Sequence, residues 1–189
     1  MNDDVHITID TKVPDDQIDQ FYELYEDAFG PLRTKAIARQ VLHREEFRAE
    51  MIDARVQKHV ARTPFGEPIG VTTLTRHLDT VPWISPEYFA ARYPEHAARD
   101  AIFYIGFTLV TPRARQGVAF HAMIESVAQV LIAERAVFGW DMCSYNNTRP
   151  WFTGHIKSVL DELELEVAVE DTQTYYAAWF TGDGATKGG

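Results

Sequence analysis

The sequence predicts one domain of the mixed α/β (α+β) class, with a central sheet of about seven strands and about four main helices. Segments with strand patterns interleave with segments whose apolar residues recur every three or four positions. The chain has 189 residues, 46% of them hydrophobic, which is enough for one well-buried core and too little for two. We therefore expect one domain over residues 1–181 and a flexible tail over residues 182–189.

The first 52 residues predict a strand followed by two helices. VHITIDTK alternates apolar and polar residues, as a half-buried strand does. Apolar side chains at helical spacing then predict a helix that ends at Gly30-Pro31, formed around Ile18, Phe21, Tyr22, Tyr25 and Phe29. A second helix is expected over residues 32–52.

The middle of the chain predicts three strands and one irregular segment. ARVQKHVART and IGVTTLTRHL flank a turn rich in Gly and Pro, and their β-branched residues favour an antiparallel hairpin. Residues 79–100 mix prolines with aromatic residues and predict a long excursion with about one helical turn. AIFYIGFTLV, residues 101–110, is apolar nearly throughout, which is typical of a central strand buried on both faces.

The last part of the chain predicts two helices and three strands. A helix is expected from Phe120 to about Ala136, followed by a strand over residues 137–145. A further helix is expected within residues 151–163. LEVAV and TYYAAWF, residues 165–169 and 174–180, are expected to close the sheet as two strands.

Charge and composition exclude several functions. The formal net charge of −10 argues against general affinity for nucleic acid, whose phosphates need a basic surface. The N-terminus is acidic and the longest apolar run is short, so we expect a cytoplasmic protein without membrane attachment. The single cysteine, Cys143, is expected to be a small buried apolar residue. The seven histidines show no metal-binding spacing, and no metal is expected.

A basic turn between the apolar strand and the next helix is the first candidate binding site. VTPRARQGVAFHAMIE, residues 110–125, carries Arg113 and Arg115 beside Gly117. A helix N-terminus offers unpaired N–H donors and a positive dipole end, both of which favour an anion. Considered without its surroundings, the turn fits a solvated surface turn better than an anion site.

The order of the elements and this turn resemble the GNAT superfamily of N-acyltransferases over about residues 5–180. In that family two central strands, the fourth and fifth, splay apart at a bulge, and acyl-CoA enters the gap. A turn of the form [Q/R]-x-x-G-x-[G/A] then binds the CoA pyrophosphate. ARQGVA, residues 114–119, matches this form at Gly117 and Ala119, whereas Ala114 stands where the family has Gln or Arg.

The resemblance implies acetyl-CoA or another acyl-CoA as co-substrate. The N–H groups of residues 116–119 would hold the pyrophosphate, with Arg115 as an additional contact, and the Asn146 amide would bond the pantetheine. The cofactor-binding residues implied are Leu109, Val110, Arg115, Gln116, Gly117, Val118, Ala119 and Asn146.

The resemblance leaves the acid and the base of the reaction open. A family tyrosine seven residues beyond the asparagine often protonates the leaving thiolate, but Thr153 stands there in this chain. Tyr145 and His155 are the substitutes considered for this acid. Asp141, expected on the same strand face as Tyr145, and Tyr104 are further catalytic candidates, with Asp100 also considered as base.

The aromatic residues of the excursion are candidates for the acceptor site. Trp83, Tyr88, Phe89 and Tyr93 could line an apolar pocket at the cleft, or they could cover the sheet as ordinary core. We expect a small-molecule or peptide amine as the acceptor, and a homodimer is possible.

Two other functions stay open. The aromatic insertion also fits a relative of the N-acyl amino acid and acyl-homoserine-lactone synthases, which take acyl chains from acyl carrier protein. The missing tyrosine and the changed first loop residue fit an inactive GNAT-like module that binds acyl-CoA or regulates a partner.

The glycine of the basic turn gives a direct test of the phosphate site. Gly117→Glu should abolish CoA binding without unfolding the protein, because a side chain and a negative charge would both meet the pyrophosphate. Arg115→Ala should weaken binding by only about 1 to 2 kcal/mol, since it removes one charge-assisted contact among several. Calorimetry measures both effects, and unchanged affinity in a folded Gly117→Glu variant would refute the phosphate site.

Overall fold

The computed structural model describes residues 5–39, 41–111, 118–148 and 165–179. Its centre is a five-stranded sheet in the order β1-β2-β3-β4-β5. The strands are β1 (His6–Asp10), β2 (Val56–Arg62), β3 (Pro68–Thr75), β4 (Ile102–Val110) and β5 (Val137–Gly139). The first four pair antiparallel and β5 runs parallel to β4, which confirms the predicted mixed sheet.

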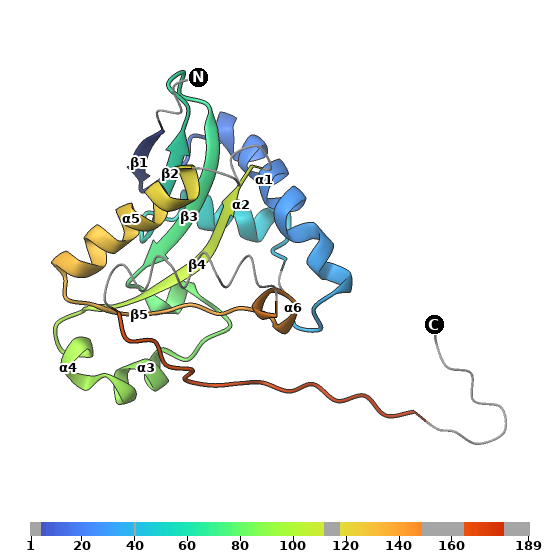
Figure 1. Cartoon of the computed structure of the whole chain (residues 1–189), viewed down its shortest axis with the longest axis vertical. Coiled ribbons are helices and arrows are strands. Elements are labelled where there is room, and N and C mark those ends of the chain that lie inside the picture. Colours follow the sequence, from blue (N-terminus) through green and yellow to red (C-terminus); the bar gives the residue numbers. More distant parts are fainter. Residues whose placement is uncertain (1–4, 40, 112–117, 149–164, 180–189) are drawn as a thin grey trace.

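Helices cover both faces of the sheet (Figure 1). The helices are α1 (Asp15–Phe29), η1 (Gly30–Thr34), α2 (Arg44–Ile52), η2 (Leu78–Thr80), α3 (Pro86–Arg92), α4 (Pro94–Ala97), α5 (Val118–Ala133) and α6 (Ser144–Asn147). Helices α1 and α2 pack on one face, where Val60 and Val71 point into their core, and α5 packs on the other, against Ala61 and Leu74. Because neighbouring strand residues point to opposite faces, Val60 and Ala61 lie in separate clusters.

An aromatic cluster joins α1 and α2 to β4. The Tyr25 ring centroid lies 4.9 Å from that of Phe29, 5.0 Å from that of Phe47 and 5.2 Å from that of Phe107. Phe21, Tyr25 and Phe47 are almost fully buried. The helical periodicity that predicted α1 is confirmed, because the residues that carried it form this core.

The predicted second helix over residues 32–52 is wrong in its first half. The chain forms the short η1 and then no helix until Arg44. The Leu42 N–H donates to the hydroxyl of the buried Tyr25 at 2.9 Å, and not to a carbonyl of a helix. The His43 N–H donates to the Glu46 carboxylate at 2.7 Å, which satisfies one of the unpaired donors where α2 begins.

The hairpin β2–β3 is confirmed, and β4 lies inside the sheet between β3 and β5, although β3 is the middle strand. Gly66, with a φ of +86°, makes the hairpin turn in a conformation that other residues rarely adopt. The excursion over residues 79–100 holds more helix than the one turn predicted, namely α3 and α4. The Ser85 hydroxyl accepts the Tyr88 N–H and caps α3, and Pro86 follows at the start of the helix, where proline is favoured.

The predicted strands near the C-terminus are wrong in extent. The strand expected over residues 137–145 ends at Gly139. Residues 165–179 form no strand, and among the described residues no backbone hydrogen bond joins them to the sheet. The Glu170 carboxylate instead accepts hydrogen bonds from Tyr88, Arg92 and Tyr93, and the chain then runs away from the body (Figure 1). Within the described residues the sheet therefore has five strands and not about seven.

Several predicted features lie outside the described residues. They are most of the basic turn, in residues 112–117, the helix within residues 151–163, and the tail over residues 182–189.

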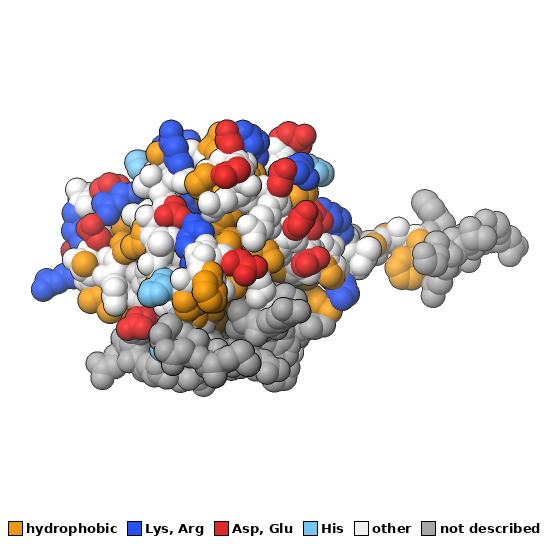
Figure 2. All heavy atoms as spheres, turned by 90° about the horizontal axis from the view of Figure 1, so that it is seen from above, with side chains coloured by type: hydrophobic (Ala, Val, Ile, Leu, Met, Phe, Trp, Pro, Cys, Tyr) orange, Lys and Arg blue, Asp and Glu red, His pale blue; other side chains and the backbone are white. Residues whose placement is uncertain are grey.

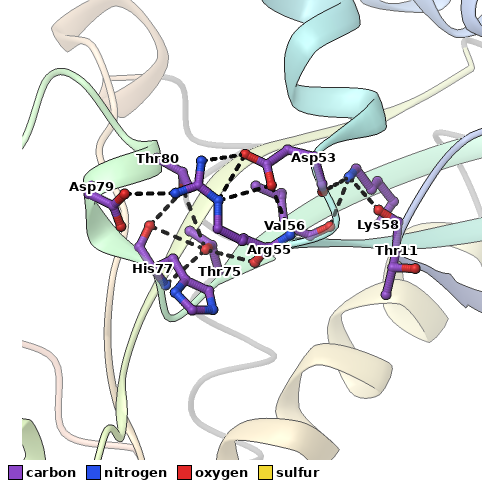
Figure 3. Close-up of polar contacts among 9 residues, drawn as sticks. All are labelled: Thr11, Asp53, Arg55, Val56, Lys58, Thr75, His77, Asp79 and Thr80. Atoms are coloured by element: carbon purple, nitrogen blue, oxygen red, sulfur yellow. Dashed lines mark hydrogen bonds and ion pairs between the residues drawn. The ribbon is translucent and has the colours of Figure 1, made fainter.

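A polar corner fixes the start of the excursion to the sheet (Figure 3). The Arg55 guanidinium, between α2 and β2, forms ion pairs with Asp53 at 2.7 Å and with Asp79 of η2 at 2.8 Å. The buried Lys58 ammonium donates to three backbone carbonyls, those of Thr11, Asp53 and Val56, at 2.7–3.0 Å. The corner thus joins β1, α2, β2 and the excursion at one end of the sheet.

The exterior mixes the two signs of charge. On the face shown in Figure 2, basic and acidic side chains alternate with apolar ones. Many of these charges form ion pairs, such as Arg33 with Glu26 at 2.6 Å and Arg44 with Asp19 at 2.5 Å. Within the described residues, no helix combines the length and apolar character that crossing a membrane requires.

A buried histidine gives a prediction about acid stability. The His59 ring lies between β2 and α5 with its Nδ1 2.8 Å from the Ser126 hydroxyl, and burial lowers the pKa of His59 from 6.5 to about 4. The unfolded chain therefore takes up this proton at higher pH than the folded chain does. His59 should cost the fold about 3 kcal/mol as the pH falls from 6.5 to below 4. His59→Gln should lose this part of the pH dependence in denaturant unfolding measured at pH 7 and pH 4, and an unchanged dependence would contradict the account.

Candidate active site between the splayed strands

The two central strands separate after three residue pairs. β4 pairs with β5 at Ile102↔Val137, Phe103↔Phe138 and Tyr104↔Gly139, and β4 then continues to Val110 without it. A Cβ on Gly139 would lie 3.0 Å from the Phe89 ring and 3.1 Å from the Tyr104 ring. A larger residue at position 139 would therefore disturb the last pair. The predicted splay between strands 4 and 5 is confirmed.

A bulge in β4 lies just beyond the last pair. Thr72 pairs with Thr108 and Leu74 with Ile105, so Thr73 of β3 stands opposite both Gly106 and Phe107. The Phe107 N–H donates to the Thr73 hydroxyl at 3.2 Å. A Cβ on Gly106 would lie only 2.6 Å from the same hydroxyl oxygen, so the bulge requires glycine at this position.

A cavity of about 320 Å³ occupies the gap. Its walls come from α1, from the segment between η1 and α2, from β4, from α5 and from the loop after β5. The lining residues include Tyr25, Phe29, Leu42, Ile105, Gly106, Phe107, Phe120, Ile124, Val127, Leu131, Trp140, Met142 and Cys143, and most of them are apolar. Of the predicted site residues, Trp83, Asp141 and Asn146 line it. Cys143 is half-buried at this wall and packs on the core, so it is more accessible than expected.

Asp141 is held at the cavity wall by two hydrogen bonds. Its Oδ1 accepts the Tyr104 hydroxyl at 2.6 Å and the Trp83 indole N–H at 2.9 Å. Tyr104 is buried and Asp141 is exposed. Burial, followed by the negative charge of Asp141, raises the pKa of Tyr104, so its hydroxyl stays protonated and donates. The structure thus joins three residues that the sequence analysis named separately.

Glu50 lies beside the bulge, although the sequence analysis did not single it out. Its Oε1 lies 3.3 Å from the position of a Cβ on Gly106. Burial raises the pKa of Glu50, while a hydrogen bond with Thr73 lowers it by a smaller amount. Glu50 follows Phe47 by three residues, on the apolar face of α2. A charged residue on an apolar helix face is the signal that could have identified it.

Tyr145 lies in α6 and not on a strand. Because β5 ends at Gly139, the expectation that Asp141 and Tyr145 share a strand face is wrong. The Lys35 ammonium lies 4.9 Å from the centre of the Tyr145 ring, which packs against the α1–α2 core. Tyr145 is not among the described residues that line the cavity.

Other candidates lie around the cavity without lining it. The Tyr88 hydroxyl donates to Glu170, and the Phe89 ring packs edge-on against Tyr104 at 6.1 Å. Phe89 therefore supports Tyr104 as part of the core. Asp100 lies before β4 and pairs with Arg76 at 3.5 Å.

The predicted CoA residues are described only in part. Leu109 and Val110 end β4 on opposite faces of the sheet, and Val118 and Ala119 begin α5. Arg115, Gln116, Gly117 and His155 lie outside the described residues. Among the residues that are described, no group of three or more His, Cys, Asp and Glu side chains is placed to hold a metal ion.

The chain resembles several solved acetyltransferases. An aminoglycoside acetyltransferase, meta-AAC0020 from an uncultured soil metagenomic sample, matches 92% of this chain and 96% of its own, with a TM-score of 0.54 at 12% identity. Ribosomal-protein-alanine N-acetyltransferase from Brucella melitensis biovar Abortus 2308 matches 93% of this chain and 99% of its own, with a TM-score of 0.53 at 11% identity. AAC(6')-Iy, solved with the bisubstrate analogue CoA-S-monomethyl-acetylneamine, matches 93% of this chain and 99% of its own, with a TM-score of 0.51 at 13% identity.

Comparison by sequence gives no match: no family model matches the chain, and no curated protein matches it. The structural matches span nearly the whole of each chain at identities that establish the fold alone. With the splayed strands, the bulge and the cavity between them, they show that this chain has the fold of the GNAT superfamily of N-acyltransferases.

Proposed function

We propose that this protein is an N-acyltransferase that moves an acyl group from acyl-CoA to an amine of a small molecule or peptide. The observation that carries the proposal is the apolar cavity between β4 and β5, with the Asp141 carboxylate at its wall. An apolar gap suits the pantetheine and acyl parts of the donor, because it excludes water from the thioester. The aminoglycoside and ribosomal-protein acetyltransferases that share the fold support an amine acceptor.

Asp141 would bind the acceptor's ammonium group. Tyr104 and Trp83 both donate to Oδ1, whereas Oδ2 accepts no hydrogen bond from the described residues. A carboxylate fixed through one oxygen can present the other to a cation without first reorganising. Trp83, half exposed beside it, would give the acceptor an aromatic surface.

The donor side would use the residues that the family resemblance implies. The Asn146 amide lies at the cavity wall, where it could bond the pantetheine. The turn at residues 114–119 would hold the pyrophosphate, with Arg115, Gln116 and Gly117 in the roles predicted above. Tyr145 and His155 remain the candidates for protonating the leaving thiolate.

A longer acyl chain is a second possibility for the donor. The cavity follows α5 from Phe120 to Ile132, and its wall there is apolar. An acetyl group needs little of this length. Acyl chains of medium length, carried by CoA or by acyl carrier protein, would fill more of it.

Turnover decides between an enzyme and a binding module. Release of free CoA should be measured with acetyl-, octanoyl- and dodecanoyl-CoA against a panel of small amines and peptides. We expect amine-dependent release with at least one donor. If the protein binds acyl-CoA tightly but acylates no amine, it is an inactive module, and if it binds no acyl donor the proposed function is wrong.

The alkylation rate of Cys143 can show whether acyl-CoA occupies the gap between β4 and β5. Because Cys143 lines the cavity, acyl-CoA at ten times its Kd should slow alkylation of this thiol about tenfold. Alkylation by iodoacetamide can be followed by mass spectrometry, with adenosine 3',5'-bisphosphate as the control that lacks a pantetheine arm. An unchanged rate at saturating acyl-CoA would show that the donor does not enter this cavity.

The substitution Asp141→Asn removes the negative charge with little change in the shape of the side chain. Asp141→Asn keeps an oxygen that can accept from Tyr104 and Trp83 but loses the negative charge. We expect kcat/KM for the amine to fall about 100-fold while the Kd for acyl-CoA stays close to the parent's. Steady-state kinetics and calorimetry measure the two quantities. Equal loss of donor binding would show that Asp141 supports the cavity and does not bind the amine.

A further inference from the structure

The Glu50 carboxyl lies beside Gly106, a residue of the cavity wall, and is not itself among the described residues that line the cavity. Its Oε1 lies 3.3 Å from where a Cβ on Gly106 would stand, and Gly106 lines the cavity. Tyr25, a second lining residue, interacts electrostatically with Glu50. The Glu50 residue as a whole is half-buried.

Glu50 belongs to no ion pair in the described part of the chain. The charged or titratable groups that face it are Lys58 on β2, Asp53 after α2 and Tyr25 on α1. The Lys58 ammonium donates its three N–H groups to backbone carbonyls, as Figure 3 shows. Within the described residues it forms no direct ion pair with the Glu50 carboxyl. The other groups near Glu50 are the Thr73 hydroxyl of β3 and the Gly106 backbone of β4.

β4 brings Glu50 and Asp141 to one face of the sheet. Tyr104, which holds Asp141, and Gly106, which contacts Glu50, are two residues apart. Alternate strand residues share a face and lie about 7 Å apart along the strand. An ammonium group bound to Asp141 over β4 would therefore lie on the same face of the strand as Glu50, about one such step away.

We propose that Glu50 takes the proton from the acceptor's ammonium, a role that rests on the proposed acyltransferase function. The ammonium gives one proton to the Glu50 carboxylate, and the neutral nitrogen attacks the thioester carbon. The C–N bond forms and the C–S bond breaks, and the nitrogen gives up a second proton while the thiolate gains one, either directly or through the acid named above. Glu50 then releases its proton to solvent, so that the products are an amide, free CoA and one proton.

The environment of Glu50 suits this step. Burial raises the pKa of its carboxyl above the ordinary value of 4.5. A base is most effective when its pKa is close to the working pH, since it then binds the proton without being protonated in advance. Asp141 and Glu50 thus divide the work, with one binding the cation and the other removing its proton.

The test is Glu50→Gln, with Glu45→Gln as the matched control on the exposed side of the same helix. Glu50→Gln should lower kcat about 100-fold at pH 7. It should also remove the limb of the pH–rate profile that falls toward acid, and leave the Kd for acyl-CoA unchanged. Glu45→Gln should behave as the parent.

Stability separates this role from a structural one. A carboxyl whose folded pKa is raised stabilises the fold only at low pH, and this contribution is lost as the pH rises through the folded pKa. Glu50→Gln should therefore melt several degrees above the parent at pH 8 and at the same temperature near pH 4. A variant that is both more stable and less active supports the proposal. Lost activity with a lower Tm at pH 8 would overturn it.

Glu50→Ala provides a second variant, in which added formate should restore part of the rate by replacing the missing carboxylate. Absence of rescue in a folded Glu50→Ala that binds acyl-CoA would contradict the proposal. A parent that acylates no amine overturns the proposed function and this role together. A parent that is active, with Glu50→Gln equal to Glu45→Gln, overturns the role of Glu50 alone.

Discussion

The short pairing between β4 and β5 is the constraint on which the candidate site depends. Three residue pairs join the strands, and the last involves Gly139, where a side chain would press on the Phe89 and Tyr104 rings. Beyond that pair the bulge at Gly106 and Phe107 turns β4 away. A fourth and fifth pair would close the gap and displace both its apolar lining and Asp141.

The rest of the fold holds the two sides of this gap in place. The aromatic cluster around Tyr25 fixes α1 and α2 against Phe107, just past the bulge. At the other end of the sheet, the corner around Arg55 fixes the start of the excursion, which carries Trp83 to Asp141. Two carboxyl groups from distant parts of the sequence therefore meet one strand, and burial distinguishes Glu50 chemically from the exposed Asp141.

The sequence was informative where local pattern and tertiary packing agree. The spacing of Phe21, Tyr25 and Phe29 predicted α1, and the apolar run at residues 101–110 predicted β4. It failed where packing overrides pattern. Residues 165–169 alternate like a strand, yet Glu170 binds Tyr88 and Arg92 of α3, and no strand among the described residues pairs with them. The bond between Tyr104 and Asp141 spans 37 positions, and the contact of Glu50 with the bulge joins different elements, so neither could be found from periodicity.

A crystal structure with bound CoA would show whether the acyl donor occupies the gap between β4 and β5. We expect the pantetheine arm between the strands beyond Tyr104 and Gly139, with the sulfur close to Gly106 and Asp141 and the pyrophosphate at the start of α5. CoA bound elsewhere on the protein, or a gap filled by the protein's own side chains in the complex, would show that the gap is not the donor site.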